Sequence, residues 1–205
     1  MRQAARVMLM TSMLCAFISV AGCAHRSPNA SFYTLTPQAA ATGNAVQVAD
    51  KPVAVIVGPA DFPRALRRAQ LATRSGPNKI EFDQFNRWAG SLDSDFLGTV
   101  GSNLSALLGS NRIAVYPNVP VFAVDYQVSF EVQRFDSDAD GLVTLETRWV
   151  VQAGDTAAAV YVGQFNDTRM AASTDPSATV AAHSELVAAL SQDIAAQIRQ
   201  DVAGP

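Results

Sequence analysis

The sequence has few charged residues and very little lysine. Charged residues make up 16% of the 205 residues, against about 25% in an average soluble domain. Fifteen basic and eighteen acidic residues give a net charge of −3, and only Lys51 and Lys79 are lysines. This composition argues against nucleic-acid binding, which favours basic chains, and the two lysines cannot by themselves form a polybasic membrane patch; the other thirteen basic residues are arginines.

Cysteine and histidine are equally scarce, with two of each. Both cysteines lie within the first 23 residues, which excludes a four-cysteine zinc cluster and a disulfide-rich scaffold. His25 and His183 are far apart, and Ser184 follows His183 on a predicted helix, where neighbours do not face one another. Gly98 and Gly101 are too closely spaced for a nucleotide-binding fingerprint, and we expect them to allow close helix packing. We therefore predict no catalytic residue, no cofactor and no enzyme activity; a hydrolase with a dispersed site is the lowest-ranked alternative.

Residues 1–22 have the pattern of a signal peptide. Arg2 and Arg6 supply positive charge, residues 7–20 are almost wholly apolar, and no acidic residue precedes Asp50. The apolar run is shorter than the roughly 20 residues that a transmembrane helix needs. A short buried helix is the alternative, but the run has no polar face. We therefore expect residues 1–22 to be removed.

The residues that follow, Val20-Ala21-Gly22-Cys23, resemble the lipobox of bacterial lipoproteins. Cleavage before Cys23 would leave its thiol to carry a diacylglyceryl group, whereas plain secretion would leave a lone thiol in an oxidising compartment. Each buried acyl CH₂ contributes about 0.8 kcal/mol, so two or three chains anchor a protein stably. We expect residues 23–30 to form a lipidated tether. Residue 24 is Ala and not Asp, which, by resemblance to the sorting rule of Gram-negative lipoproteins, favours the outer membrane with the domain facing the periplasm.

Residues 31–205 have the pattern of a single α/β domain. A β-branched run at 53–57 reads as a buried strand that ends at Gly58-Pro59, and a hairpin is expected around Gly76-Pro77-Asn78. Apolar spacings of three or four residues predict one helix from Phe85 through Trp88 to Gly109 and another from about 176 to 202. We expect one mixed β-sheet with two long amphipathic helices packed on it. The other predicted strands are at 31–36, 113–116, 124–133, 145–151 and 160–165.

The segment Asp136-Ser137-Asp138-Ala139-Asp140-Gly141 matches the start of an EF-hand loop. Asp136, Asp138 and Asp140 are thus weak candidates for Ca²⁺ ligands. The twelfth position, however, is Thr147 in place of the usual Glu, and both flanks read as strands. A tight hairpin turn explains the same residues and is the favoured interpretation.

Four arginines, Arg64, Arg67, Arg68 and Arg74, lie within eleven residues. They are candidates for contact with an acidic partner surface or with lipid phosphates. The alternative, which we favour, is a solvated turn whose arginines pair with nearby carboxylates. Trp88 has a similar ambiguity, since it fits either the core or a half-exposed partner contact at a helix start.

Several sequence blocks together resemble the ABC-type transport auxiliary lipoproteins, the PqiC/YmbA-like family. The resemblance covers nearly all of the chain after the lipobox and is most specific at residues 71–92. The blocks are Phe32-Tyr33-Thr34-Leu35, Val57-Gly58-Pro59, Asp61-Phe62-Pro63, LATRSGPNKIEFDQFNRWAGSL at 71–92, and Val115-Tyr116-Pro117.

The resemblance implies a fold similar to anticodon-binding-like and TolB N-terminal domains, without catalysis or cofactor. It implies a lipoprotein that works with an MCE-domain protein, and in some members with an ABC permease and ATPase, in lipid transport and envelope integrity. It also implies a homo-oligomeric ring. Arg64, Arg67 and Arg68 make this segment more basic than is usual in the family, so a contact there would be particular to this branch. The alternative function is a periplasmic carrier of a lipid or another small apolar ligand.

Overall fold

A long central strand, β6 (Tyr126–Asp138), organises the sheet in the computed structural model, which describes residues 29–38 and 52–204. On one side β6 pairs antiparallel with β7, which pairs in turn with β8. On its other side the first half of β6 pairs in parallel with β2 and its end pairs with β3, so the sheet is mixed. The other strands are β1 (Ser31–Tyr33), β2 (Val55–Asp61), β3 (Gln70–Gly76), β4 (Lys79–Trp88), β5 (Ile113–Val115), β7 (Leu142–Ala153) and β8 (Ala159–Met170).

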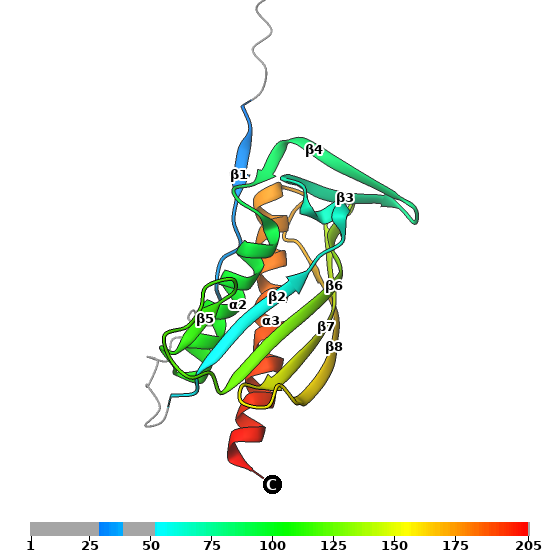
Figure 1. Cartoon of the computed structure of the whole chain (residues 1–205). Helices are drawn as coiled ribbons and strands as arrows, with labels where there is room; N and C mark the ends of the chain where they lie inside the picture. The colour runs from blue at the N-terminus through cyan, green and yellow to red at the C-terminus, as the bar shows by residue number, and fades with distance from the viewer. Residues whose placement is uncertain (1–28, 39–51, 205) are drawn as a thin grey trace, which may run out of the picture.

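Two helices, α2 (Leu92–Leu108) and α3 (Pro176–Ala203), cover one face of this sheet (Figure 1). Asp175 caps α3 by accepting a hydrogen bond from the Ser177 backbone N–H, with Pro176 in the first turn, where its missing N–H costs nothing. The core lies between the helices and the sheet, and each fully buried Leu or Val there contributes about 1.5–3 kcal/mol. Its fully buried side chains include Phe96, Val100 and Leu104 of α2, Leu186, Leu190 and Ile194 of α3, and Val57, Val128 and Leu145 of the sheet.

The predicted fold class is confirmed: one α/β domain with a mixed sheet and two long helices. The hairpin of β3 and β4 and the meander of β6, β7 and β8 lie where they were expected. The start of the first helix was predicted wrongly, because Phe85 and Trp88 belong to β4 and the helix begins at Leu92. Trp88 packs inward from the end of a strand, and its spacing to Leu92 imitates a helical period.

The prediction that β2 stops at Gly58-Pro59 is also wrong, because the strand continues to Asp61 through an irregularity in its pairing with β6. Gly58 has φ +116°, and a Cβ there would lie 2.6 Å from the Cβ of Tyr116. Only glycine fits this position, because other residues rarely adopt that φ and the space is already filled. The Gly58–Pro59 and Tyr116–Pro117 peptide bonds are both cis.

Candidate functional site

The N-terminal segment is fastened to one end of the fold. β1 pairs in parallel with β4 near the top of Figure 1. Beyond β1, the Leu35 backbone N–H donates to Oδ2 of Asp95 on α2 at 2.7 Å, and the Thr36 N–H donates to Oγ of Ser184 on α3 at 3.1 Å. Burial raises the pKa of Asp95, and the hydrogen bond from Leu35 opposes that shift. Cys23 and the rest of residues 1–28 lie outside the described residues, so the anchor itself stays a prediction, but any tether enters the fold at this end.

The arginines of residues 64–68 lie at the same end and are exposed. Arg67, in the short 3-10 helix η2 (Arg64–Arg67), pairs with Asp61, with Nη2 and Oδ1 2.5 Å apart. The guanidinium of Arg68 lies over the ring of Phe82 at 4.7 Å from its centroid, an interaction that does not use its N–H donors. Within the described residues, no carboxylate pairs with Arg64. Carboxylate pairing therefore accounts for Arg67 but not for Arg64 or Arg68.

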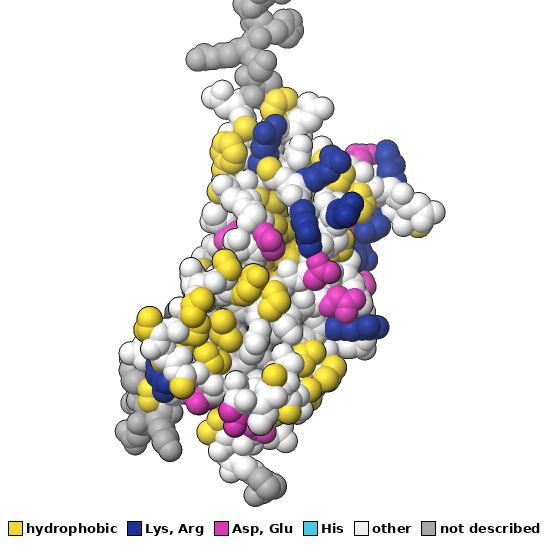
Figure 2. Space-filling model, viewed as in Figure 1, with side chains coloured by type: hydrophobic (Ala, Val, Ile, Leu, Met, Phe, Trp, Pro, Cys, Tyr) yellow, Lys and Arg dark blue, Asp and Glu magenta, His cyan; other side chains and the backbone are white. Residues whose placement is uncertain are grey.

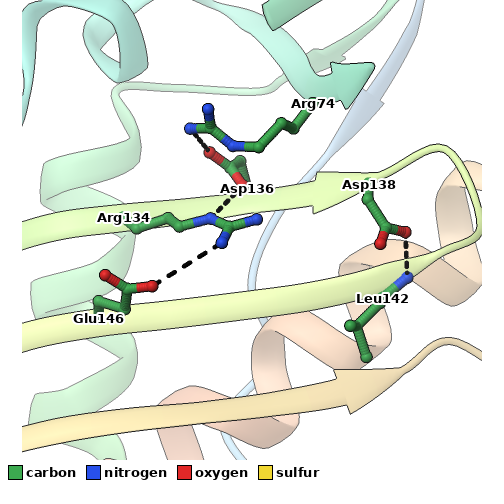
Figure 3. Close-up of polar contacts among 6 residues, drawn as sticks. All are labelled: Arg74, Arg134, Asp136, Asp138, Leu142 and Glu146. Carbon is green, nitrogen blue, oxygen red and sulfur yellow. Dashed lines mark hydrogen bonds and ion pairs between the residues drawn. The ribbon is translucent and has the colours of Figure 1, made fainter. Parts of the chain in front are cut away.

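Arg74 is used inside the fold (Figure 3). Its Nη2 donates to Oδ2 of Asp136 at 2.8 Å, and Nε of Arg134 donates to Oδ1 of the same carboxylate at 2.8 Å. Nη1 of Arg134 lies 3.8 Å from Oε1 of Glu146. Asp136 is only 2% exposed, so this charge is shielded and paired on both oxygens. The cluster joins β3 to β6 and β7, which gives Arg74 a structural role in fixing the hairpin.

The three aspartates considered for Ca²⁺ do not converge. Both oxygens of Asp136 accept from arginines, as described above, whereas Oδ1 of Asp138 accepts the backbone N–H groups of Asp140 and Leu142 at 3.0 and 2.8 Å. β6 extends through Asp138, and the turn to β7 follows it. Residues 136–141 thus form a strand end and a hairpin turn. In residues 29–38 and 52–204, the fold brings together no group of three or more side chains that could hold a metal ion.

Trp88 belongs to the core and is 5% exposed. Its ring packs edge-to-face on His183, with 5.7 Å between centroids, and His183 packs in the same way on Phe135 at 4.7 Å. Nδ1–H of His183 donates to the Thr179 carbonyl at 2.9 Å. Burial lowers the pKa of His183 to about 4, so the ring is neutral at pH 7. The half-exposed indole at a helix start, the second interpretation of Trp88, does not match this position.

An exposed apolar loop, which the sequence analysis did not single out, follows β5. On this loop, Tyr116 is 49%, Val119 87% and Val121 101% exposed. Figure 2 shows hydrophobic side chains gathered on the left of the front face, over β2 and β5. Apolar residues beside prolines, as Val119, Val121 and Phe122 beside Pro120, are the signal that could have indicated this surface, because prolines favour a loop and the apolar side chains then have no strand or helix face to pack from.

The cavities of the described residues are mostly open grooves. One groove of about 580 Å³ lies between β8 and the end of α3, lined by Tyr161, Gln197 and Asp201. Another of about 590 Å³ is lined by Arg112, Asp155 and Asp201, among others. An enclosed space beside His183 holds about 10 Å³, the size of a single water molecule. None of the described helices is both long and apolar enough to cross a membrane.

Solved structures share this fold. A crystal structure of a protein from Xanthomonas campestris has a TM-score of 0.65 at 18% identity and covers 85% of this chain and 99% of that chain. A crystal structure of an uncharacterized protein gives a TM-score of 0.68 at 18% identity, with 83% and 99% covered. A PelC dodecamer from Paraburkholderia phytofirmans is less similar, with a TM-score of 0.41 at 13% identity and 69% and 90% covered. No curated protein matches the chain.

The sequence itself gives the more specific match. Residues 33–195 match the family described as "ABC-type transport auxiliary lipoprotein component". This range spans every described strand except the start of β1, together with α2 and most of α3. The chain therefore belongs to the ABC-type transport auxiliary lipoprotein family.

Proposed function

We propose that this protein is an outer-membrane lipoprotein that acts, without catalysis, as the docking component of an MCE-type lipid transport and envelope-integrity system. Its residues 1–22 are removed, Cys23 carries the acyl chains, residues 23–30 form the tether, and the domain from residue 31 lies in the periplasm. The partners are an MCE-domain protein and, in some systems, an ABC permease and ATPase, but not nucleic acid. Membership of a transport auxiliary lipoprotein family supports this role.

The observation that carries the proposal is the separation of two surfaces. The N-terminal segment is fixed to α2 and α3 through Leu35 and Thr36. The apolar loop with Val119 and Val121 lies on the β5 side of the sheet, where hydrophobic side chains gather on the front face (Figure 2). Exposed apolar patches typically mark surfaces for protein partners. A domain held to a membrane at one place and apolar at another is suited to docking.

The cavities favour docking over the carrier alternative. Pockets for apolar ligands are generally enclosed and bury most of the ligand surface. The two large grooves are open, and both have Asp201 in their lining. The enclosed space beside His183, at about 10 Å³, is far too small for an acyl chain.

We further propose that copies of the chain assemble into a homo-oligomeric ring, as the family resemblance implies. Among the described strands β8 pairs with β7 alone, so one edge of its twelve residues is free of a strand partner there and could pair with a second copy. Native mass spectrometry of the acylated protein in detergent tests this. A monomer at all concentrations would contradict it.

The docking role can be tested by photo-crosslinking in cells. A benzophenone amino acid at Val121 should capture an MCE-domain protein, whereas the same group at Asp140, on the exposed β6–β7 turn, should not. Cys23→Ala removes the acylation site, and Ala24→Asp keeps the site but directs the protein to the inner membrane. We expect capture only by the wild-type anchor. Equal capture at Val121 and Asp140, or none at either, would contradict docking through the apolar loop.

A further inference from the structure

Charge is unevenly divided along this acidic chain. Residues 61–90, which form the end of β2, η2, β3 and β4, contain six basic and three acidic residues. Residues 92–204 contain five basic and fourteen acidic residues. Figure 2 shows the dark-blue side chains gathered in the upper part of the front face, over η2, β3 and β4. A positive surface on a chain of net charge −3 points to an anionic partner at this end.

We propose that this end of the domain binds the phosphate headgroups of anionic lipids in the membrane that holds the protein. The surface, here called the basic end, is defined by Arg64, Arg68 and Arg87 together with Phe32. This headgroup-binding proposal rests on the proposed function in one respect, because the acyl anchor on Cys23 is what places the basic end near a membrane.

The three arginines of the basic end have no carboxylate partner among the described residues. Arg64 and Arg68 are exposed, and Arg68 is supported from below by the ring of Phe82. Nε of Arg87 donates to the Gln84 backbone carbonyl at 3.1 Å, which leaves its other nitrogens unused. The remaining cations of residues 61–90 are matched: Arg67 by Asp61, Lys79 by Glu81, and Arg74 by the buried Asp136. The unmatched charge thus belongs to the residues that define the basic end.

Exposed aromatic side chains accompany these arginines. Phe32 on β1 is 63% exposed, and it is the register partner of Arg87 on β4. Register partners of adjacent strands point to the same face of the sheet, so the side chains of Phe32 and Arg87 project from one face. Phe85, also on β4, is 39% exposed. Apolar rings among cations suit the lipid interface, where rings enter the acyl boundary while cations remain at the headgroups.

The position of the tether favours a membrane over an acidic protein as the partner. Cys23 lies six residues before Asn29, the first described residue. Six extended residues reach about 20 Å, so an acylated Cys23 keeps β1 within that distance of the bilayer. Because the anchor already confines this end, even weak headgroup contacts are populated. The basic end then orients the domain, with β1, β3 and β4 toward the membrane.

Vesicle flotation of the mature chain, residues 23–205, with Cys23→Ala isolates these contacts from the acyl chains. The double variant Arg64→Gln/Arg68→Gln removes two charges from the basic end. The double variant Arg148→Gln/Arg169→Gln removes the same charge from exposed positions on β7 and β8. Each protein is mixed with vesicles of phosphatidylcholine alone or with about one third phosphatidylglycerol, at low and physiological salt. Circular dichroism and unfolding midpoints of all proteins establish that they are folded.

We expect the parent protein to bind anionic vesicles only, and to bind them most strongly at low salt. Arg64→Gln/Arg68→Gln should weaken this binding by roughly thirtyfold, because each surface cation contributes about 1 kcal/mol. The Arg148→Gln/Arg169→Gln control should bind like the parent. If both double variants lose vesicle binding equally, only the net charge of the protein matters. If neutral and anionic vesicles are bound equally, the anionic headgroups are not recognised. Either result overturns the proposal. The proposal is also overturned if none of the proteins binds anionic vesicles. In that case, loss of crosslinks to an acidic protein on substitution of Arg64 and Arg68 would identify a protein as the partner instead. These outcomes do not depend on acylation, which mass spectrometry of Cys23 tests separately.

Discussion

The buried His183 makes the stability of this domain sensitive to mild acid. Its ring is 3% exposed, lies between Trp88 and Phe135, and has a pKa lowered to about 4 by burial, from 6.5 in an unfolded chain. Asp136 is the charged group that opposes this shift, and it is itself paired with Arg74. Well above pH 6.5 the ring is neutral in both states and its titration has no effect. As the pH falls from 6.5 towards 4, the unfolded state binds the proton first, so stability is lost.

The expected loss follows from the two pKa values. Between pH 7.5 and 5 the free energy of unfolding should fall by about 2 kcal/mol, and by roughly 3 kcal/mol at pH 4. His183→Gln keeps a side-chain donor but does not titrate, so this contribution should be absent from the variant. Urea unfolding followed by circular dichroism at a series of pH values measures it, with His25→Gln as the control for the chain's other histidine. Subtracting the His183→Gln curve from the wild-type curve cancels the carboxylates, including Asp95, whose raised pKa acts in the opposite direction. If the two curves run parallel from pH 7.5 to 5, the burial argument is wrong.

Two paired substitutions test the packing and the ion cluster. The close packing expected at both helix glycines holds for Gly101 but not for Gly98, where a methyl group would meet nothing within 4 Å. Gly98→Ala should therefore stabilise α2 by about 0.5–1 kcal/mol. Gly101→Ala should instead cost about 1–3 kcal/mol, because its Cβ would lie 2.8 Å from a methyl carbon of Val115. Chemical unfolding compares them, and equal effects would contradict the observed packing. Asp136→Asn should lower the free energy of unfolding by about 3 kcal/mol, because two arginines lose their charged acceptor. In the same assay, Asp61→Asn at the exposed pair with Arg67 should change it by less than about 1 kcal/mol. Comparable costs would mean that burial does not control the strength of these pairs.

The fold was largely predictable because strand and helix periods persist over long segments here. Alternation along β6 and the apolar spacing of α3 gave correct elements. The errors lie where a local signal competes with tertiary structure. Trp88 continues an apparent helical period from a strand, and the helix start was signalled instead by Gly90-Ser91 followed by Asp93 and Asp95, acidic residues that suit a first helical turn.

The role of each arginine was not predictable from the sequence. Arg67, Arg68 and Arg74 lie within eight residues, yet one pairs at the surface, one stacks on an aromatic ring and one is drawn into the interior. What separates them is the partner that the sheet supplies, and for Arg74 that partner is Asp136, 62 residues further along the chain. Spacing along a sequence cannot report such a contact. The EF-hand pattern at Asp136 shows the same limit of sequence spacing, because this carboxylate accepts from two arginines and the turn that follows it is the favoured hairpin.

The blocks that carry the family resemblance mostly perform structural work. Gly58 in β2 and Tyr116 just after β5 pack against each other, Arg74 joins β3 to the central strand, and Trp88 packs on His183 in the core. These residues therefore hold this fold together and leave little exposed chemistry for recognising a partner. The exposed residues of these blocks, such as Phe32 and Tyr116, lie instead at the two surfaces proposed to make contacts, which are the basic end and the apolar loop around Val121. Since headgroup binding depends on charge and protein docking on apolar area, salt should weaken the first and spare the second. A salt series therefore distinguishes headgroup binding by the basic end from protein docking by the apolar loop in the same molecule.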